Sequence, residues 1–193
     1  MTLRGVNWPA VLGGSAIGAG ILAVCVAFAA DGPPLPYVRL ALVALAAAAA
    51  FVLDEPCAAA VDAVPVTRRG RTAIRVTAVA LPFAVWTVAV LALERRNGAT
   101  AVGALLVEGA GMLAVAVAVS AVLRLAGRAE PGEIVASFLG ASMLGALIFR
   151  PAPGSVPIFP VGEGWAASTA LWGSFAVAAT MLVVALSRDP YRR

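Results

Sequence analysis

The residue with the clearest chemical potential is an isolated carboxylate in a long apolar run. Glu108 is the only charged residue between positions 99 and 123. If this run crosses a membrane, a charged acid there is costly. We therefore expect its side chain to face other helices or a cavity, or to be protonated. Two roles fit: contact with a substrate or proton on a translocation path, or a structural hydrogen bond between helices. No second acid and no lysine in the apolar runs forms a pair with it, which disfavours a proton relay.

A second concentration of charge lies in the segment 54–75, which separates two apolar runs. Asp54 and Glu55 precede Pro56, and proline is favoured in the first turn of a helix. The negative charge of the two acids suits the positive end of a helix dipole. The residue before a proline avoids the helical region, so we predict a short helix from Pro56 to Val64 that ends before the next proline. An arginine-rich helix should follow it.

Two interpretations of this segment fit its residues. It is either an element that docks on a cytoplasmic protein, or an interfacial helix held at anionic lipid headgroups by arginine. The sequence leaves both open. The residues that we predict to contact a partner are Asp54, Glu55, Asp62, Arg68 and Arg69.

The segment 150–164 combines four prolines with apolar residues. A solvated loop does not need such apolar content, so we predict a re-entrant or interface-hugging element that caps the outer face of the protein. Irregular backbone at membrane depth must be buried in protein or border a wet cavity. An ordinary loop stiffened by proline is the alternative interpretation.

The sequence lacks the residues that several kinds of catalytic site require. There is no histidine, which removes histidine-ligated haem or zinc and Ser–His catalysis. The two cysteines, Cys25 and Cys57, form neither a CxxC pair nor a disulfide framework. The GxxxxGK[ST] phosphate loop is also missing, so ATP cannot bind in the usual P-loop manner. We therefore expect no enzyme activity, no metal and no cofactor in this chain.

Composition and hydropathy point to a membrane. Apolar residues make up 62% of the 193 residues, whereas soluble domains contain about 45–50%. Uncharged runs of about twenty residues predict membrane-spanning helices. We therefore predict an all-α membrane protein in which residues 1–193 form a single transmembrane domain. Its six predicted spans are 9–30, 35–53, 72–93, 99–123, 134–149 and 165–186.

The arginines set the expected orientation. All fourteen basic residues are arginine. If the N-terminus is inside, ten of them lie in cytoplasmic segments and four in external ones. Because positive residues concentrate on the cytoplasmic side, both termini are predicted to be cytoplasmic. Arg39, near the start of the second span, is expected to extend toward the interface. The basic pI is explained by topology, so we expect no nucleic-acid partner.

The order of these elements resembles the permease subunits of type-2 ABC exporters. The resemblance rests on six spans, a short cytoplasmic helix between spans two and three, and an apolar external segment between spans five and six. The stretch from Leu53-Asp54-Glu55-Pro56 to Thr67-Arg68-Arg69-Gly70-Arg71 also looks like loops in small permeases of GC-rich bacteria. The chain departs from the family in its small size and in a short N-terminal segment, where many relatives carry a longer connecting helix.

The resemblance implies a function in transport. Substrate would pass through a dimeric bundle in a bacterial inner or plasma membrane. The second permease would be an identical copy or a paralogue. ATP and Mg²⁺ would bind on separate cytoplasmic ATPase subunits. The helix between spans two and three would be the coupling helix that contacts them, and Glu108 is the candidate for the translocation path.

Two other classes of function remain open. A membrane scaffold or assembly protein would have no transport path, and its 54–75 segment would bind only lipid. An ion-coupled carrier of small solutes would use Glu108, and its transport would depend on pH without any ATPase.

Overall fold

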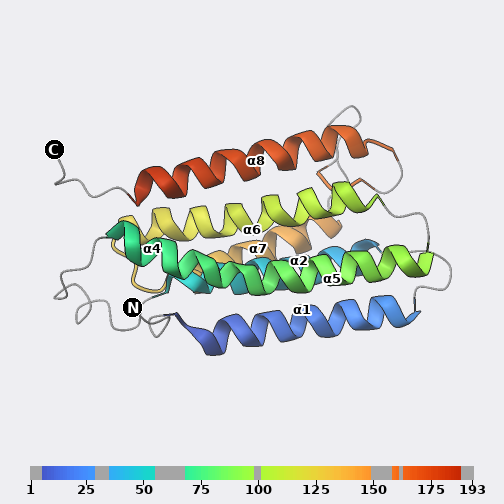
Figure 1. Cartoon of the computed structure of the whole chain (residues 1–193), viewed down its shortest axis with the longest axis horizontal. Helices are drawn as coiled ribbons and strands as arrows, with labels where there is room; N and C mark the ends of the chain where they lie inside the picture. Colours follow the sequence, from blue (N-terminus) through green and yellow to red (C-terminus); the bar gives the residue numbers. More distant parts are fainter. Residues whose placement is uncertain are drawn as a thin grey trace.

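The computed structural model describes residues 6–28, 35–54, 68–97, 101–148, 158–160 and 163–187, and every regular element among them is helical. The elements are long helices that run side by side in alternating directions (Figure 1). They are α1 (Trp8–Phe28), α2 (Leu35–Ala50) with the 3₁₀ turn η2 (Phe51–Leu53), α4 (Arg68–Val76), the 3₁₀ turn η3 (Thr77–Val79), α5 (Ala80–Asn97), α6 (Val102–Leu125), α7 (Pro131–Ile148) and α8 (Trp165–Leu186).

Five helical segments in the described residues are long and apolar enough to cross a membrane. They are Trp8–Phe28, Leu35–Leu53, Gly70–Arg96, Val102–Leu125 and Trp165–Leu186. A multi-pass helical membrane protein accounts for them, as the sequence indicated. The predicted fifth span, 134–149, falls largely in α7, which is not among these five. The third candidate is Gly70–Arg96, where 72–93 was predicted.

A proline explains the irregular turn in that third segment. Pro82 has no N–H, so it cannot bond the carbonyl of Ala78 four residues earlier, and its ring crowds that carbonyl. The chain tightens into the 3₁₀ turn η3 at this point and then continues as α5. The arginine-rich α4 and the apolar α5 are thereby joined without a loop.

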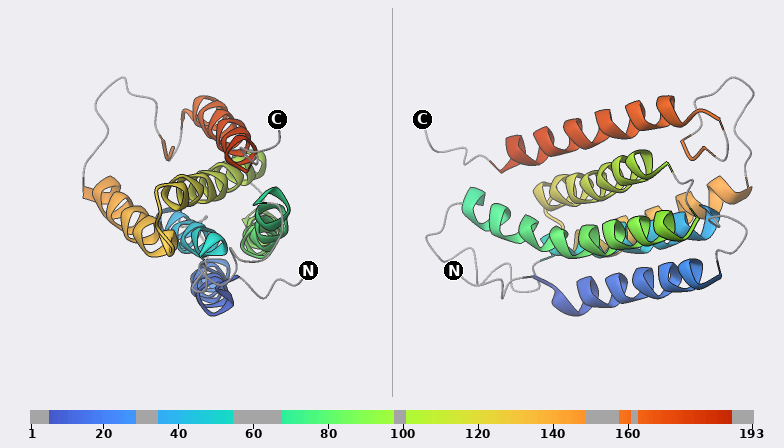
Figure 2. Two further views of the ribbon diagram at one scale, coloured as in Figure 1. Left: turned by 90° about the vertical axis from the view of Figure 1, so that its left-hand side faces the viewer. Right: turned by 45° about the vertical axis from the view of Figure 1, so that its right-hand side comes forward.

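Two helices form the centre of the bundle. α2 packs against α1, α5, α6 and α7, and α6 packs against α2, α5, α7 and α8. The end-on view in Figure 2 shows α2 and α6 surrounded by the other four. In the spanning windows, 61% of the α2 residues and 50% of the α6 residues are buried, against 11% in α8. A charged side chain is therefore most easily removed from lipid on α2 or α6.

Small residues permit the close packing of α1 on α2. A Cβ atom added to Gly14 would lie 2.9 Å from the Cβ of Ala48, and one added to Gly18 would lie 2.7 Å from the Cγ of Leu45. Glycine is thus required at both positions for the two backbones to approach. Such contacts hold membrane helices together where lipid offers no hydrophobic driving force.

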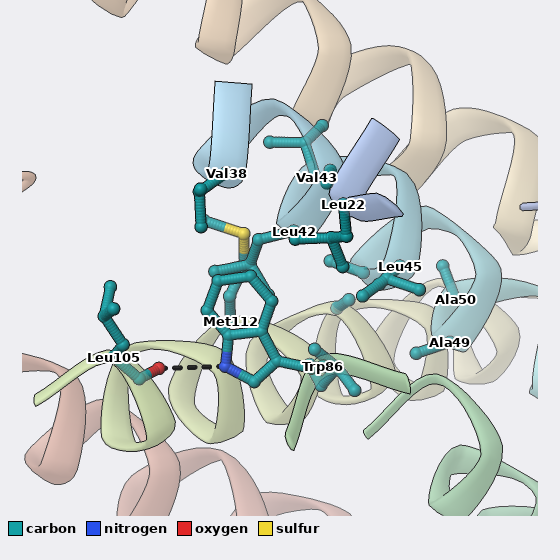
Figure 3. Close-up of a cluster of buried hydrophobic side chains, with 14 of the residues drawn as sticks. Leu22, Val38, Leu42, Val43, Leu45, Ala49, Ala50, Trp86, Leu105 and Met112 are labelled. Carbon is teal, nitrogen blue, oxygen red and sulfur yellow. Dashed lines mark hydrogen bonds between the residues drawn. The ribbon is translucent and has the colours of Figure 1, made fainter. Parts of the chain in front are cut away.

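A buried tryptophan joins α5 to α6. Trp86 is fully buried, and its indole Nε1 donates a hydrogen bond of 2.9 Å to the backbone oxygen of Leu105 (Figure 3). The ring lies against Gly109, where a Cβ would overlap it. The glycine next to Glu108 therefore has a packing role.

The helix ends define two ends of the bundle. α4 lies at the end where α1 begins and α8 finishes, on the left of Figure 1. We call this the α4 end. α2, α6 and α8 begin at the opposite end, which we call the Trp165 end.

Candidate functional site

The acid identified from the sequence lies in a buried ion pair. The Nε of Arg39, on α2, donates to Oε1 of Glu108, on α6, at 3.0 Å, and its Nη2 approaches Oε2 at 3.4 Å. Arg39 is 3% exposed and Glu108 is 1% exposed. Both carboxylate oxygens thus accept from one guanidinium, the two-pronged geometry that gives the strongest pairing of these groups. The pair connects the two central helices.

This geometry corrects one expectation drawn from the sequence, because Arg39 is buried among the helices instead of extending outward. For Glu108 it agrees with the structural hydrogen bond between helices, and the partner is an arginine. The depths of the two residues match: Arg39 lies four residues after the start of α2 and Glu108 six residues after the start of α6, both at the Trp165 end. These offsets correspond to about 6 and 9 Å along the helices. Their similar distance from the starts of two spans was the signal that sequence reasoning missed.

The guanidinium also holds a backbone carbonyl of the chain. Nη2 of Arg39 donates to the oxygen of Pro160 at 2.7 Å. Its central carbon lies 5.2 Å from the ring centroid of Phe159 and 5.7 Å from that of Trp165, within the range of cation–π attraction. One arginine therefore ties α2, α6 and residues 159–160 together.

Residues 158–160 are fixed from α8 as well. The indole nitrogen of Trp172 and the hydroxyl of Ser168 both donate to the backbone oxygen of Ile158, at 2.9 and 3.1 Å. The Phe159 ring stacks on Trp172 with centroids 5.8 Å apart. Pro160 is buried. This part of the predicted capping segment folds inward at the Trp165 end. Residues 150–157, 161 and 162 lie outside the described residues.

A second set of polar contacts lies at the α4 end. The carboxylate of Asp54 accepts a hydrogen bond of 2.7 Å from the backbone N–H of Gly132, in the first turn of α7. Nη1 of Arg124, near the end of α6, donates to the oxygen of Leu53 at 2.9 Å. A carboxylate at a helix N-terminus is favoured by an unpaired N–H and by the helix dipole. Asp54 thus joins the end of α2 to the start of α7.

The burial of Asp54 changes its protonation. The residue is 1% exposed, and this burial raises the pKa of its carboxyl to about 6, with a further rise from Glu130 and Glu133. The hydrogen bond from Gly132 and the charge of Arg124 oppose the rise. The acid therefore titrates close to neutral pH.

The raised pKa predicts a pH-dependent stability. The folded chain holds the Asp54 proton more tightly than the unfolded chain, so its stabilising effect is complete below about pH 4 and is lost as pH rises to about 6. The expected loss is about 2–3 kcal/mol. Thermal unfolding in detergent across pH 4 to 7 measures it. Asp54→Asn should remove this component of the slope. Glu94→Gln, at an exposed acid near the Trp165 end, should leave it.

Of the other four residues predicted to contact a partner, the structure describes two. Glu55 and Asp62, together with the predicted helix Pro56–Val64, lie outside the described residues. Arg68 and Arg69 begin α4, at the start of the segment that continues into α5. The carboxylate of Asp54 faces the chain's own α7. Sequence reasoning did not identify the contacts of Arg39, Arg124 and Gly132, which span 69, 71 and 78 positions.

The chemistry available to the ion pair is limited. A carboxylate held by arginine through both oxygens is a poor general base, and breaking such a buried pair is strongly destabilising. Glu108 lines neither the groove between α1 and α5 nor the groove between α5, α6 and α8. Within the described ranges, no group of three or more cysteines and acids could hold a metal ion. The arrangement therefore connects helices rather than presenting a reactive group.

The features that bear on function are the buried pair at the Trp165 end, the basic α4 at the other end and the helical membrane architecture between them. They place the chain in the broad class of multi-pass membrane proteins. No family model, no curated protein and no solved structure matches the chain.

Proposed function

We propose that this chain is the membrane-spanning permease subunit of an ATP-driven exporter of the type-2 ABC class. In this proposal it crosses the bacterial cell membrane six times, with both termini and the α4 end in the cytoplasm. α7 is the fifth of the six spans. Its 18 residues give a helix of about 27 Å, close to the hydrocarbon thickness of about 30 Å.

The observation that carries the proposal is the direct junction of α4 with α5. α4 begins with arginines and continues through a single 3₁₀ turn into the apolar α5, and the stretch Gly70–Arg96 is long and apolar enough to cross a membrane. A force applied to α4 by a cytoplasmic partner would act on α5 with no loop to absorb it. α5 is in turn joined to the central α6 through Trp86 and Leu105.

The Trp165 end supports the same proposal. An exporter needs an outer closure that holds until substrate passes, and residues 158–160 fold inward there on Arg39, Ser168 and Trp172. In this mechanism, Arg39 and Glu108 hold the closure on the two central helices. Glu108 then acts as a tether in the outer gate. The alternative of an ion-coupled carrier gains nothing from the geometry, because both oxygens of Glu108 accept from Arg39.

The proposed complex contains two permeases and two ATPases. ATP and Mg²⁺ bind only on the ATPase subunits, which dock at the α4 end. α8 is the least buried of the candidate spans, and its exposed apolar side chains offer a surface to lipid or to the second permease. Among these side chains are Phe175, Val177 and Met181.

Charge reversal in α4 tests the proposal. We expect Arg68→Glu/Arg69→Glu to release the ATPase from the purified complex or to reduce its ATP hydrolysis at least tenfold, because opposite charges at a docking surface become like charges. The matched control is Arg95→Glu/Arg96→Glu, which reverses two exposed arginines near the Trp165 end. Both variants should insert in the membrane normally. If the two variants retain the ATPase equally and hydrolyse ATP at the same rate, α4 does not dock the ATPase, and its arginines only bind lipid.

A further inference from the structure

A groove opens to the side of the bundle near the α4 end. Its floor is α6, where Ala110 and Ala114 leave space, and its walls are α4–α5 and α8. The end-on view in Figure 2 shows α6 between these two walls. The groove has a volume of about 610 Å³, within the usual range for small-molecule sites of about 300–1,000 Å³.

The lining of the groove suits a hydrocarbon chain. Eleven of its fourteen residues are apolar, and the other three carry hydroxyl groups. Two of those hydroxyl residues, Thr72 and Ser187, lie at the α4 end, where the membrane meets water. On α6 the groove extends from Ala110 to Val117, about two helical turns. A long apolar tail fits this shape, with its polar head near Thr72 and Ser187.

Positive charge lies beside the polar end of the groove. Arg71 precedes Thr72, and Arg75 follows one turn later on the same helix. Arg71 is partly exposed and Arg75 is buried. Arginine near a membrane surface attracts anionic headgroups, with about 1 kcal/mol for each residue. The charge next to the groove therefore selects an amphiphile with a negative head.

We propose that this groove binds an anionic phospholipid from the leaflet at the α4 end. One acyl chain lies along α6 between α5 and α8, and the phosphate lies at Arg71, near Thr72 and Ser187. The proposal does not depend on an ATPase partner. It gives α4 a ligand in the membrane in addition to its proposed cytoplasmic partner, and it makes the α4–α5 junction sensitive to lipid composition.

The second groove provides an internal comparison. It lies between α1 and α5, has a volume of about 710 Å³ and is lined by alanine, valine and leucine together with Arg96. Arg96 stands at the Trp165 end, so this groove opens to the other leaflet. Its size is similar and Arg96 lines it with Arg95 next to it in the chain, but no hydroxyl residue lines it and the exposed acid Glu94 lies two residues before Arg96. We expect no strong headgroup preference there.

The test uses the delipidated wild-type chain in detergent, without ATPase. Dioleoyl phosphatidylglycerol or dioleoyl phosphatidylcholine is added, and native mass spectrometry counts the lipids retained. We expect one phosphatidylglycerol to be retained at least fivefold more strongly than phosphatidylcholine. Arg71→Gln should reduce this preference about fivefold, whereas Arg96→Gln should not change it. Ala114→Phe, which fills the floor of the groove, should abolish retention.

Several results would overturn the proposal. Equal retention of the two lipids would remove the headgroup preference, and unchanged retention in Ala114→Phe would place the lipid elsewhere. A dimer that excludes lipid would identify a second copy of the chain as the occupant. Arg71→Gln changes a partly exposed side chain, so it keeps the test valid even if Ala114→Phe fails to fold. Because no ATPase is present, failure here leaves the proposed transport function untouched.

Discussion

Glu108→Ala is expected to destabilise the folded chain by about 3–5 kcal/mol, the usual cost of removing one partner from a buried ion pair. Arg39 would remain at 3% exposure among helices, still bonded to Pro160 but without its counter-charge. Guanidinium does not lose its proton in proteins, so the charge cannot be neutralised locally. Unfolding in mixed micelles, followed by helical circular dichroism, measures the change.

Two further variants make this prediction specific to the pair. Arg39→Leu/Glu108→Leu should cost less than the sum of the two single leucine variants, because each single variant leaves one unpaired charge whereas the double variant leaves none. Glu163→Ala removes an exposed acid near the Trp165 end and should change stability by less than about 0.5 kcal/mol. If Glu108→Ala were as stable as Glu163→Ala, the ion pair described here would be absent in the membrane.

Gly109→Val is expected to destabilise the chain by about 2–6 kcal/mol, because the new side chain would occupy the position of the Trp86 ring. Overpacking of a dense core costs about 1–3 kcal/mol. Displacing the indole also breaks its bond to Leu105 and leaves a buried polar group unpaired, which adds about 1–3 kcal/mol. The same unfolding assay applies.

The control for this variant lies on the same helix. A Cβ at Gly103 would meet no atom within 4 Å, so Gly103→Ala should be neutral or stabilise the helix by up to about 1 kcal/mol. Comparable losses in the two variants would show that α6 does not tolerate side chains in general. The proposal that Gly109 is needed to make room for the Trp86 ring would then be wrong.

The helices were predictable because each depends on local sequence. Runs of about twenty apolar residues have few alternatives in a membrane, and the proline-rich stretches between them end helices. The predicted starts of the second and last spans coincide with those of α2 and α8. The arginine-rich helix that was predicted before the third span corresponds to α4, which begins at Arg68.

The contacts of the charged residues were not predictable in the same way. Which residue faces Glu108 depends on the rotation of α2 and α6 about their axes, and a run of alanines and valines does not determine that rotation. The sequence suggested that Asp54 begins a helix at Pro56. Its carboxylate in fact accepts from the first turn of α7, 78 positions later. Partners so distant depend on how the whole bundle packs.

The proposed function is tested most directly by purifying the tagged wild-type chain from its native membranes in mild detergent. The account predicts that an ATPase subunit copurifies in a fixed ratio, that the complex hydrolyses ATP, and that the Arg68/Arg69 reversal removes both properties. A stable, correctly folded chain that contains no nucleotide-binding subunit would contradict it.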